Sequence, residues 1–227
     1  MIKNTAPTNE LSNFGTGGGT NLLRRRMLMR QNISENYITE GLLYRWVAED
    51  VKNDLWADRI SGKIINLFNT QKDGNRLIFD GQSSYGSTDS AEIGMDCTLE
   101  VVANATRNSS VFVCFANNIG VAVNSSGKII IGQPGSYVFE TNGLQKQTLS
   151  VTGGENCIAV QNQIELQKAN ADYLYSVNKN WLVGKRDGGT YNDYFLDGNI
   201  YEIRLYNRRL STDEIVSNQK IDMEKYF

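Results

Sequence analysis

From about residue 41 onward, short runs of apolar or alternating residues are separated by Gly, Asn, Asp and Ser. Such punctuation is typical of β-strands joined by turns, and no long helical pattern lies between the runs. The pattern therefore predicts an all-β sandwich rather than a parallel α/β sheet. The strands expected are Leu42–Trp46, Arg76–Phe79, Thr98–Ala103, Val111–Ala116, Gly120–Val123, Lys128–Ile131, Thr148–Val151, Cys157–Val160, Gln163–Leu166, Trp181–Val183 and Gly198–Tyr206.

The last of these strands alternates in character along its length. Ile203 and Leu205 lie on one face, whereas Glu202 and Arg204 lie on the other. Successive side chains of a strand point to opposite faces of the sheet. The alternation therefore predicts that one face of this sheet is in contact with solvent.

A helix start follows directly. Ser211 and Glu214 have the spacing of a capping box, and Leu210 is placed to pack against Ile215. We expect a short helix that ends at about Asn218.

Residues 1–40 differ from the rest in composition. The Gly/Thr run Gly15–Thr20 leads into the basic and apolar segment Leu22–Arg30, which has no continuous apolar stripe on a helical wheel. The pattern predicts an N-terminal anchoring arm over residues 1–40 and one domain over residues 41–227. The arm residues expected to bind a partner are Leu22, Leu23, Arg24, Arg25, Arg26, Met27 and Arg30.

Three segments carry a resemblance to a known family. They are the opening segment Gly41–Gly62 with its Asp-x-x-Ser-Gly turn, the Phe-Asp-Gly segment Leu77–Tyr85 and the closing run Phe195–Ile215. In this order they resemble motifs of the laminin-G-like, concanavalin A-like jelly-roll family. The resemblance implies two antiparallel sheets and ligands held on the concave sheet or at loop edges. It implies no one function, because lectins, adhesins and glucanases share the scaffold.

Charge and composition exclude several functions. The chain has no histidine, so histidine-based triads and zinc sites are excluded. A net charge of −2 gives no overall attraction to nucleic acid or anionic membrane, and no segment approaches the ~20 apolar residues of a membrane span. Glucanases of the resembling family carry a Glu-x-Asp-x-x-Glu strand, but Glu92 is followed by Gly94 where the acid belongs. We therefore expect a protein that is not an enzyme and binds neither nucleic acid nor membrane.

A ligand site is predicted where aromatic and polar residues gather, between residues 172 and 194. Sugar sites combine an aromatic platform with hydrogen-bonding groups. The alternative is that these residues fill the core or half-buried strand positions. The candidates are Tyr173, Tyr175, Trp181, Arg186, Tyr191, Asn192, Asp193 and Tyr194.

Calcium is common in the resembling family, and hard oxygen ligands lie within the matched motifs. The ordinary role of Asp in turns accounts for the same positions, so both interpretations stay open and no cofactor is required. The candidate ligands are Asp50, Asp58, Asp80 and Asp197.

The three cysteines, Cys97, Cys114 and Cys157, have no metal-type spacing and are expected to be free, buried thiols. No signal-peptide core is found near the start of the chain, which favours folding in a cytoplasm. Together with the arm, this favours a homo-oligomeric bacteriophage virion protein, a head fibre, tail fibre or capsid decoration, whose arm contacts other virion proteins and whose lectin-like domain binds host glycan. The alternatives are an extracellular or cell-surface location, as a secreted bacterial carbohydrate-binding module or a glycoside hydrolase of the same fold.

Overall fold

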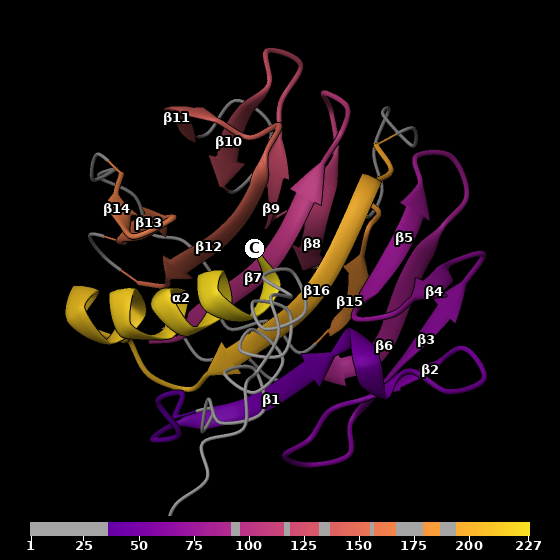
Figure 1. The fold of residues 1–227 in the computed structure, drawn as a ribbon, viewed down its shortest axis with the longest axis horizontal. Helices are drawn as coiled ribbons and strands as arrows, with labels where there is room; N and C mark the ends of the chain where they lie inside the picture. Colours follow the sequence, from indigo (N-terminus) through magenta and orange to yellow (C-terminus); the bar gives the residue numbers. More distant parts are fainter. Residues whose placement is uncertain are drawn as a thin grey trace, which may run out of the picture. The chain divides into compact units, whose positions relative to one another are not determined.

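The computed structural model describes residues 36–91, 96–115, 119–131, 137–154, 157–166, 179–186 and 194–227. Within these residues the chain forms two antiparallel β-sheets and a C-terminal helix, α2 (Thr212–Tyr226). The two-sheet all-β sandwich predicted from the sequence is confirmed (Figure 1).

We name the two sheets A and B. Sheet A carries the N-terminal strand and the closing strand, which pair with each other. Its strand order is β14 (Ile164–Glu165), β13 (Ala159–Gln161), β12 (Lys146–Thr152), β7 (Thr98–Ala105), β16 (Asp197–Tyr206), β5 (Arg76–Asp80) and β4 (Gln71–Asp73), with β1 (Leu42–Val47) also paired to β16. A short 3-10 helix, η1 (Ala48–Asp50), follows β1.

Sheet B packs against sheet A and ends in the short edge strand β2. Its strand order is β11 (Tyr137–Asn142), β10 (Lys128–Ile131), β9 (Ile119–Val123), β8 (Val111–Phe115), β15 (Lys179–Val183), β6 (Tyr85–Ala91), β3 (Ile64–Phe68) and β2 (Leu55–Ala57).

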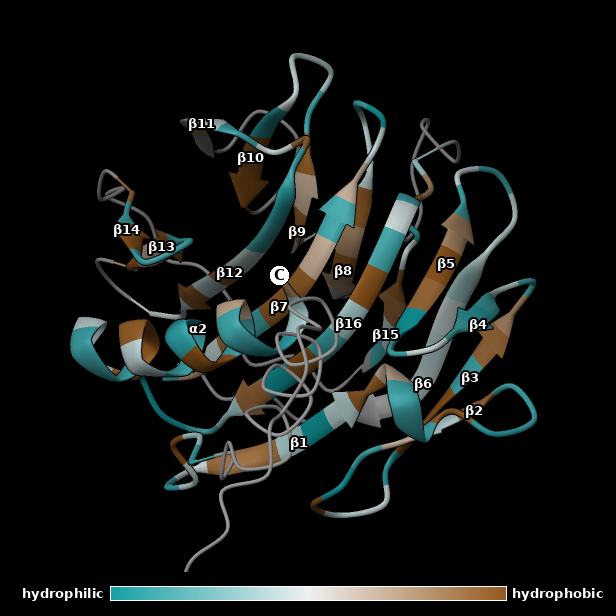
Figure 2. Cartoon of the chain, in the orientation of Figure 1, coloured by the Kyte–Doolittle hydropathy of each residue, from teal (hydrophilic) through white to brown (hydrophobic). Residues whose placement is uncertain are grey.

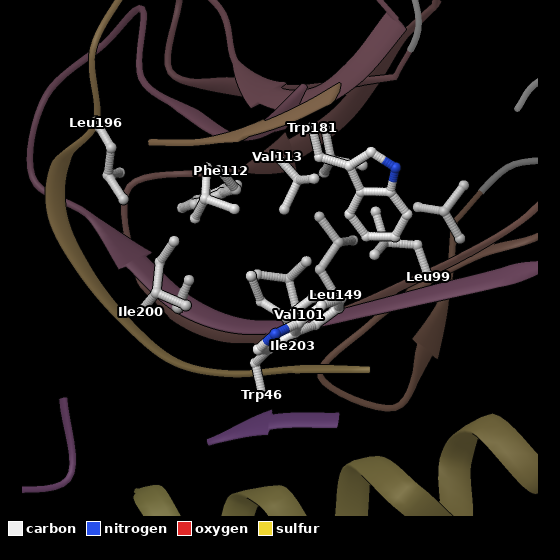
Figure 3. Close-up of a cluster of buried hydrophobic side chains, with 14 of the residues drawn as sticks. Trp46, Leu99, Val101, Phe112, Val113, Leu149, Trp181, Leu196, Ile200 and Ile203 are labelled. Carbon is white, nitrogen blue, oxygen red and sulfur yellow. The ribbon is translucent and has the colours of Figure 1, made fainter. Parts of the chain in front are cut away.

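The hydrophobic core lies between the two sheets. Trp46 of β1 and Trp181 of β15 meet there edge to face, with ring centroids 5.7 Å apart. Phe112 from sheet B and Ile200 from sheet A fill the space beside them (Figure 3). All four side chains are buried. Aromatic side chains bury large apolar areas, so the contact between β1 and β15 ties the two sheets together at their centre.

Several strands of the N-terminal half were not among those predicted. They are β2, β3, β4 and β6, all of which lie within residues 55–91. β6 reads Tyr-Gly-Ser-Thr-Asp-Ser-Ala, a composition that is depleted in strands. Gly86 is needed in it because a Cβ there would lie 2.7 Å from Ile65. The position of β6 thus depends on side chains of the neighbouring strands packing over its backbone, which an apolar pattern in its own sequence does not report.

At Glu202 and Arg204 the outer face of sheet A is not in contact with solvent, which corrects the prediction for these two residues. Hydrophilic and hydrophobic residues alternate along β16 as expected (Figure 2). Both charged side chains are nevertheless fully buried, because α2 lies across this face. The capping box of Ser211 and Glu214 is confirmed, but the helix continues to Tyr226 instead of ending near Asn218.

Residues 37–40 belong to the folded domain, although the sequence pattern assigned them to the arm. The compact unit spans Tyr37–Phe227. Tyr37 is buried, and the backbone N–H of Ile38 donates to Asn218 Oδ1 at 2.9 Å. The predicted arm residues Leu22 to Arg30 lie outside the described residues. None of the helices described is long and apolar enough to cross a membrane.

Candidate functional site

The two sheets differ in what lies on their outer faces. Helix α2 lies across the outer face of sheet A (Figure 1), whereas in sheet B the strand β3, next to the edge strand β2, alternates exposed and buried side chains along its length. Ile65 and Leu67 point into the core, so Ile64, Asn66 and Phe68 point outward. The outer face of sheet B at β2, β3 and β6 is therefore the face on which a ligand can lie. We name it the β3 face.

Four side chains form a continuous stack on the β3 face. The ring of Phe68 stacks on Tyr85, with centroids 4.6 Å apart and ring planes 16° from parallel. The Lys185 ammonium lies 4.7 Å from the Tyr85 centroid and 5.3 Å from that of Phe195. Because Phe68 fills one face of the Tyr85 ring, the ammonium takes the other. We name Phe68, Tyr85, Lys185 and Phe195 the aromatic stack.

Strand register explains how these residues meet. Phe68 of β3 is directly paired with Tyr85 of β6, and opposed residues of antiparallel strands have side chains on the same face. Lys185 and Phe195 face each other in an isolated bridge beyond the end of β15. Phe68 is 42% exposed, so its outer ring face is open to a ligand.

Polar groups line the same face beside the stack. Asn66 is exposed and pairs across the sheet with Ser87 of β6, whose side chain points outward because Gly86 and Thr88 point into the core. Amide and hydroxyl groups supply both hydrogen-bond donors and acceptors. The β3 face thus presents an aromatic ring next to groups that can bond sugar hydroxyls.

The sequence-predicted ligand residues divide into three groups. Trp181 is a core residue, as the alternative interpretation held. Arg186 and Tyr194 are half-buried, and the Arg186 guanidinium lies 5.6 Å from the Tyr194 ring centroid, next to the stack in the sequence. The others lie outside the described residues: Tyr173, Tyr175, Tyr191, Asn192 and Asp193.

Phe68 was missed because it precedes the predicted site by about a hundred residues, and only the sheet brings the two together. The available signal was the period-two alternation Ile64–Phe68, which predicts a half-buried strand with Phe68 on its polar side.

The four candidate calcium ligands lie in η1, directly after β2, at the end of β5 and at the start of β16, and they bind protein groups. Asp58 is buried and accepts backbone N–H bonds from Ile60 and Lys63. Asp50 pairs with Arg59 at 2.6 Å. In the part of the chain that the structure describes, no group of three His, Cys, Asp or Glu side chains is arranged to hold a metal ion. Calcium binding stays a prediction.

The remaining two, at the end of β5 and the start of β16, also accept hydrogen bonds from protein groups. Asp80 accepts backbone N–H bonds from residues 82, 83 and 84, and Asp197 accepts from the Thr106 hydroxyl at 2.5 Å. Burial opposes ionisation of Asp80, but the bonds from Ser83 and its neighbours outweigh burial and lower the pKa of this carboxyl well below its usual range.

A buried charge network lies between sheet A and α2. The Arg204 guanidinium contacts three carboxylates, those of Glu100 at 2.7 Å, Glu202 at 2.8 Å and Asp222 at 2.6 Å. Arg45 pairs with Glu202 at 2.7 Å. Buried charges require such partners, since an isolated ion in the interior is very costly.

The surroundings raise the pKa of one glutamate of this network and lower the pKa of the other. Burial raises the pKa of Glu100, and the single pairing with Arg204 does not reverse this. Burial also acts on Glu202, but Arg204 and Arg45 together outweigh it and hold the pKa of Glu202 well below its usual range. All of these carboxylates are enclosed under α2, so the network serves the fold and no ligand reaches it.

No protein-family model matches the sequence, and no curated protein matches it. Solved structures do match in fold. A Trypanosoma rangeli sialidase in complex with sialic acid shares 14% identity with a TM-score of 0.63, over 92% of this chain and 40% of its own. A covalent-intermediate complex of that sialidase with 2,3-difluorosialic acid, also at 14% identity, has a TM-score of 0.66 over the same shares. The chain thus spans about two fifths of these sialidases.

A smaller protein is matched over nearly its whole length. Domain 4 of AbnA, a GH43 extracellular arabinanase from Geobacillus stearothermophilus, in complex with arabinotriose, has 14% identity and a TM-score of 0.59. The match covers 79% of this chain and 98% of that domain. At this identity the likeness establishes the fold alone.

One sequence-based prediction is overturned by these structures. The prediction that the chain is not an enzyme is wrong as an inference, because the sialidases that share its fold are enzymes. Catalysis is no longer excluded for this chain. What the likeness establishes for this chain is the two-sheet β-sandwich fold.

Proposed function

We propose that the domain recognises carbohydrate through the β3 face, with the outer ring face of Phe68 as the stacking platform. The observation that carries the proposal is an exposed aromatic ring held flat against a second ring. A free aromatic side chain loses rotamer freedom when it binds, which costs free energy. Stacking on Tyr85 removes that freedom beforehand, so Phe68 is preorganised to receive the apolar face of a sugar.

The surroundings of Phe68 support the same function. Asn66 precedes it by two residues on the same face of β3, and Ile64 is 41% exposed two residues earlier still. Alternate residues of a strand are roughly 6.6 Å apart, so the three side chains form a row that an extended oligosaccharide can follow. Leu55 of the paired strand β2 widens the apolar part of this row.

The test compares two phenylalanines of similar exposure. Phe68→Ala removes the platform, whereas Phe227→Ala removes a ring that is 44% exposed at the end of the chain, beyond α2. Binding of arabinan, galactan, xylan, β-glucan, pectin and alginate is measured by affinity electrophoresis and titration calorimetry. Phe68→Ala should weaken binding about tenfold, the size of one lost aromatic contact. Equal binding by wild type and Phe68→Ala contradicts the proposal, as does a panel with no ligand.

The setting of the domain is a separate part of the proposal. Likeness to a domain of an extracellular arabinanase supports a secreted carbohydrate-binding protein better than a virion component. The neighbours in fold offer no support for a virion role. Attachment through residues 1–40, oligomerisation and display on a virion stay predictions.

A further inference from the structure

Lys185 has an unusual position within the aromatic stack. Its side chain is half-buried, and its ammonium lies between the rings of Tyr85 and Phe195. No carboxylate of the described residues lies within ion-pair distance of it. The negative ring faces hold the cation in place without neutralising its charge.

Two acids of the described residues near this segment bind other groups. Asp80 accepts three backbone N–H bonds of its own turn, and Asp197 accepts from Thr106. Arg186 adds a second cation next to Lys185, over the ring of Tyr194. Among the described residues, this end of the stack thus carries two cations, although the whole chain carries a net charge of −2.

We infer that the ligand is an acidic saccharide, whose carboxylate pairs with Lys185. This inference rests on the proposed carbohydrate site. A neutral sugar can accept only an ordinary hydrogen bond from the ammonium, whereas a carboxylate forms a stronger, charge-assisted one. The low-dielectric rings around the ammonium make that interaction stronger than one in open solvent.

The stack also separates the two contacts. The ring of Tyr85 lies between Phe68 and Lys185, so the sugar that stacks on Phe68 is not the one whose carboxylate reaches Lys185. The preferred ligand is consequently an oligosaccharide with at least two residues. The protein should bind a single uronic acid and its methyl ester with equal affinity.

Matched ligands and matched variants test this. The ligands are oligogalacturonate, oligoglucuronate and oligomannuronate of four residues, each compared with its methyl ester, which keeps the sugar and removes the charge. Titration calorimetry of the full chain should give about tenfold tighter binding of one acid than of its ester, as expected for one charge-assisted bond. The preference should shrink in 0.5 M NaCl, because salt screens the pair.

Lys185→Met keeps the apolar stem against both rings and removes the charge, so it should abolish the preference for the acid and leave binding of the ester within twofold. Lys185→Arg should retain the preference. Lys220→Met, an exposed lysine on α2, is the control and should change neither.

The outcomes separate this inference from the proposed function. If acid and ester bind equally and Phe68→Ala weakens both, the domain binds carbohydrate and the inference about Lys185 is overturned. A preference that survives in Lys185→Met overturns it as well. If wild type binds neither these ligands nor any neutral polysaccharide, the proposed function fails.

Discussion

Arg204 of β16 forms a bidentate ion pair with Asp222 of α2, with Nη1 2.8 Å from Oδ1 and Nη2 2.6 Å from Oδ2. Both side chains are fully buried. Two parallel N–H bonds to one carboxylate fix the orientation of each partner as well as the distance. This pair joins the closing strand to the helix that covers it.

Asp222→Asn should strongly destabilise the domain. The substitution leaves Arg204 with less negative charge around it and disturbs the bonds that Asp222 accepts from Tyr37 and Thr148. Removing one partner of a buried pair costs about 3–5 kcal/mol. Urea unfolding measures the difference. Glu224→Gln, an exposed acid of the same helix, should change the free energy of unfolding by less than about 0.5 kcal/mol. Equal loss in both variants would contradict the role given to the pair.

The charge of Glu202 should stabilise the folded state at neutral pH and lose this effect at acidic pH. Because its pKa is lowered on folding, its charge stabilises the native state above the unfolded value of about 4.3, and this is lost as pH falls toward the folded value. Glu202→Gln should thus cost several kcal/mol at pH 7, on the order of a broken buried pair, and the difference from wild type should narrow below pH ~4.

The difference between these two proteins is the quantity to measure, because Glu100 acts in the opposite sense. The pKa of Glu100 is raised on folding, so Glu100 adds stability as pH falls and partly hides the loss at Glu202 when wild type is measured by itself. Both proteins contain Glu100, so its effect cancels in the difference between them. A gap between wild type and Glu202→Gln that stays constant from pH 7 to pH 3 would contradict the assignment.

The sequence pattern predicts which side chains share a face of a strand, but not what covers that face. Alternation along β16 gave the right faces, but it cannot tell solvent from a covering helix with complementary charges. Arg204 and Glu202 look solvent-exposed until Asp222, eighteen residues beyond Arg204, is placed beside them. For the same reason the predicted helix was shorter than α2. Asn218 and Gln219 are polar yet buried, and their amide groups donate to Glu100 and Ser150.

The candidate site shows a second limit. The region around Lys185, Arg186 and Tyr194 was found from composition, because aromatic and charged residues cluster there. Phe68 could not be associated with it, because the pairing of β3 with β6 and of β6 with β15 brings the two segments together. Strand order is a tertiary property that local patterns do not contain.

The three cysteines should be unreactive in the native state. All three are buried thiols and none is in a disulfide, as the sequence predicts. Burial raises the pKa of Cys97 to about 12, so its thiolate is scarce at pH 8. Thiol labelling at pH 8 should proceed only as fast as the domain opens, and denaturant should expose three groups at once. Fast labelling of one native thiol would show that its surroundings are more open than the packing of the two sheets implies.

The start of the folded domain should lie at Tyr37 rather than at Gly41. The ring of Tyr37 lies 4.3 Å from the guanidinium carbon of Arg204 and 4.4 Å from that of Arg45, and its hydroxyl donates to Asp222 at 2.9 Å. Removing residues 1–36 should therefore leave the melting temperature within a few degrees of full-length protein. Removing residues 1–40 takes away a buried aromatic side chain over two buried cations, and should cost about 3–5 kcal/mol.

Tyr37→Phe in the full-length chain separates the two parts of this effect. It keeps the ring over both guanidinium groups and loses the bond to Asp222, so it should cost about 1–2 kcal/mol, less than the deletion. Thermal and urea unfolding of the four proteins give the comparison. If the chain that begins at Gly41 is as stable as the one that begins at Tyr37, the contacts of Tyr37 contribute nothing and the fold begins at β1. The opposite result, with loss of stability on removing residues 1–36 alone, would mean that the N-terminal segment belongs to the fold.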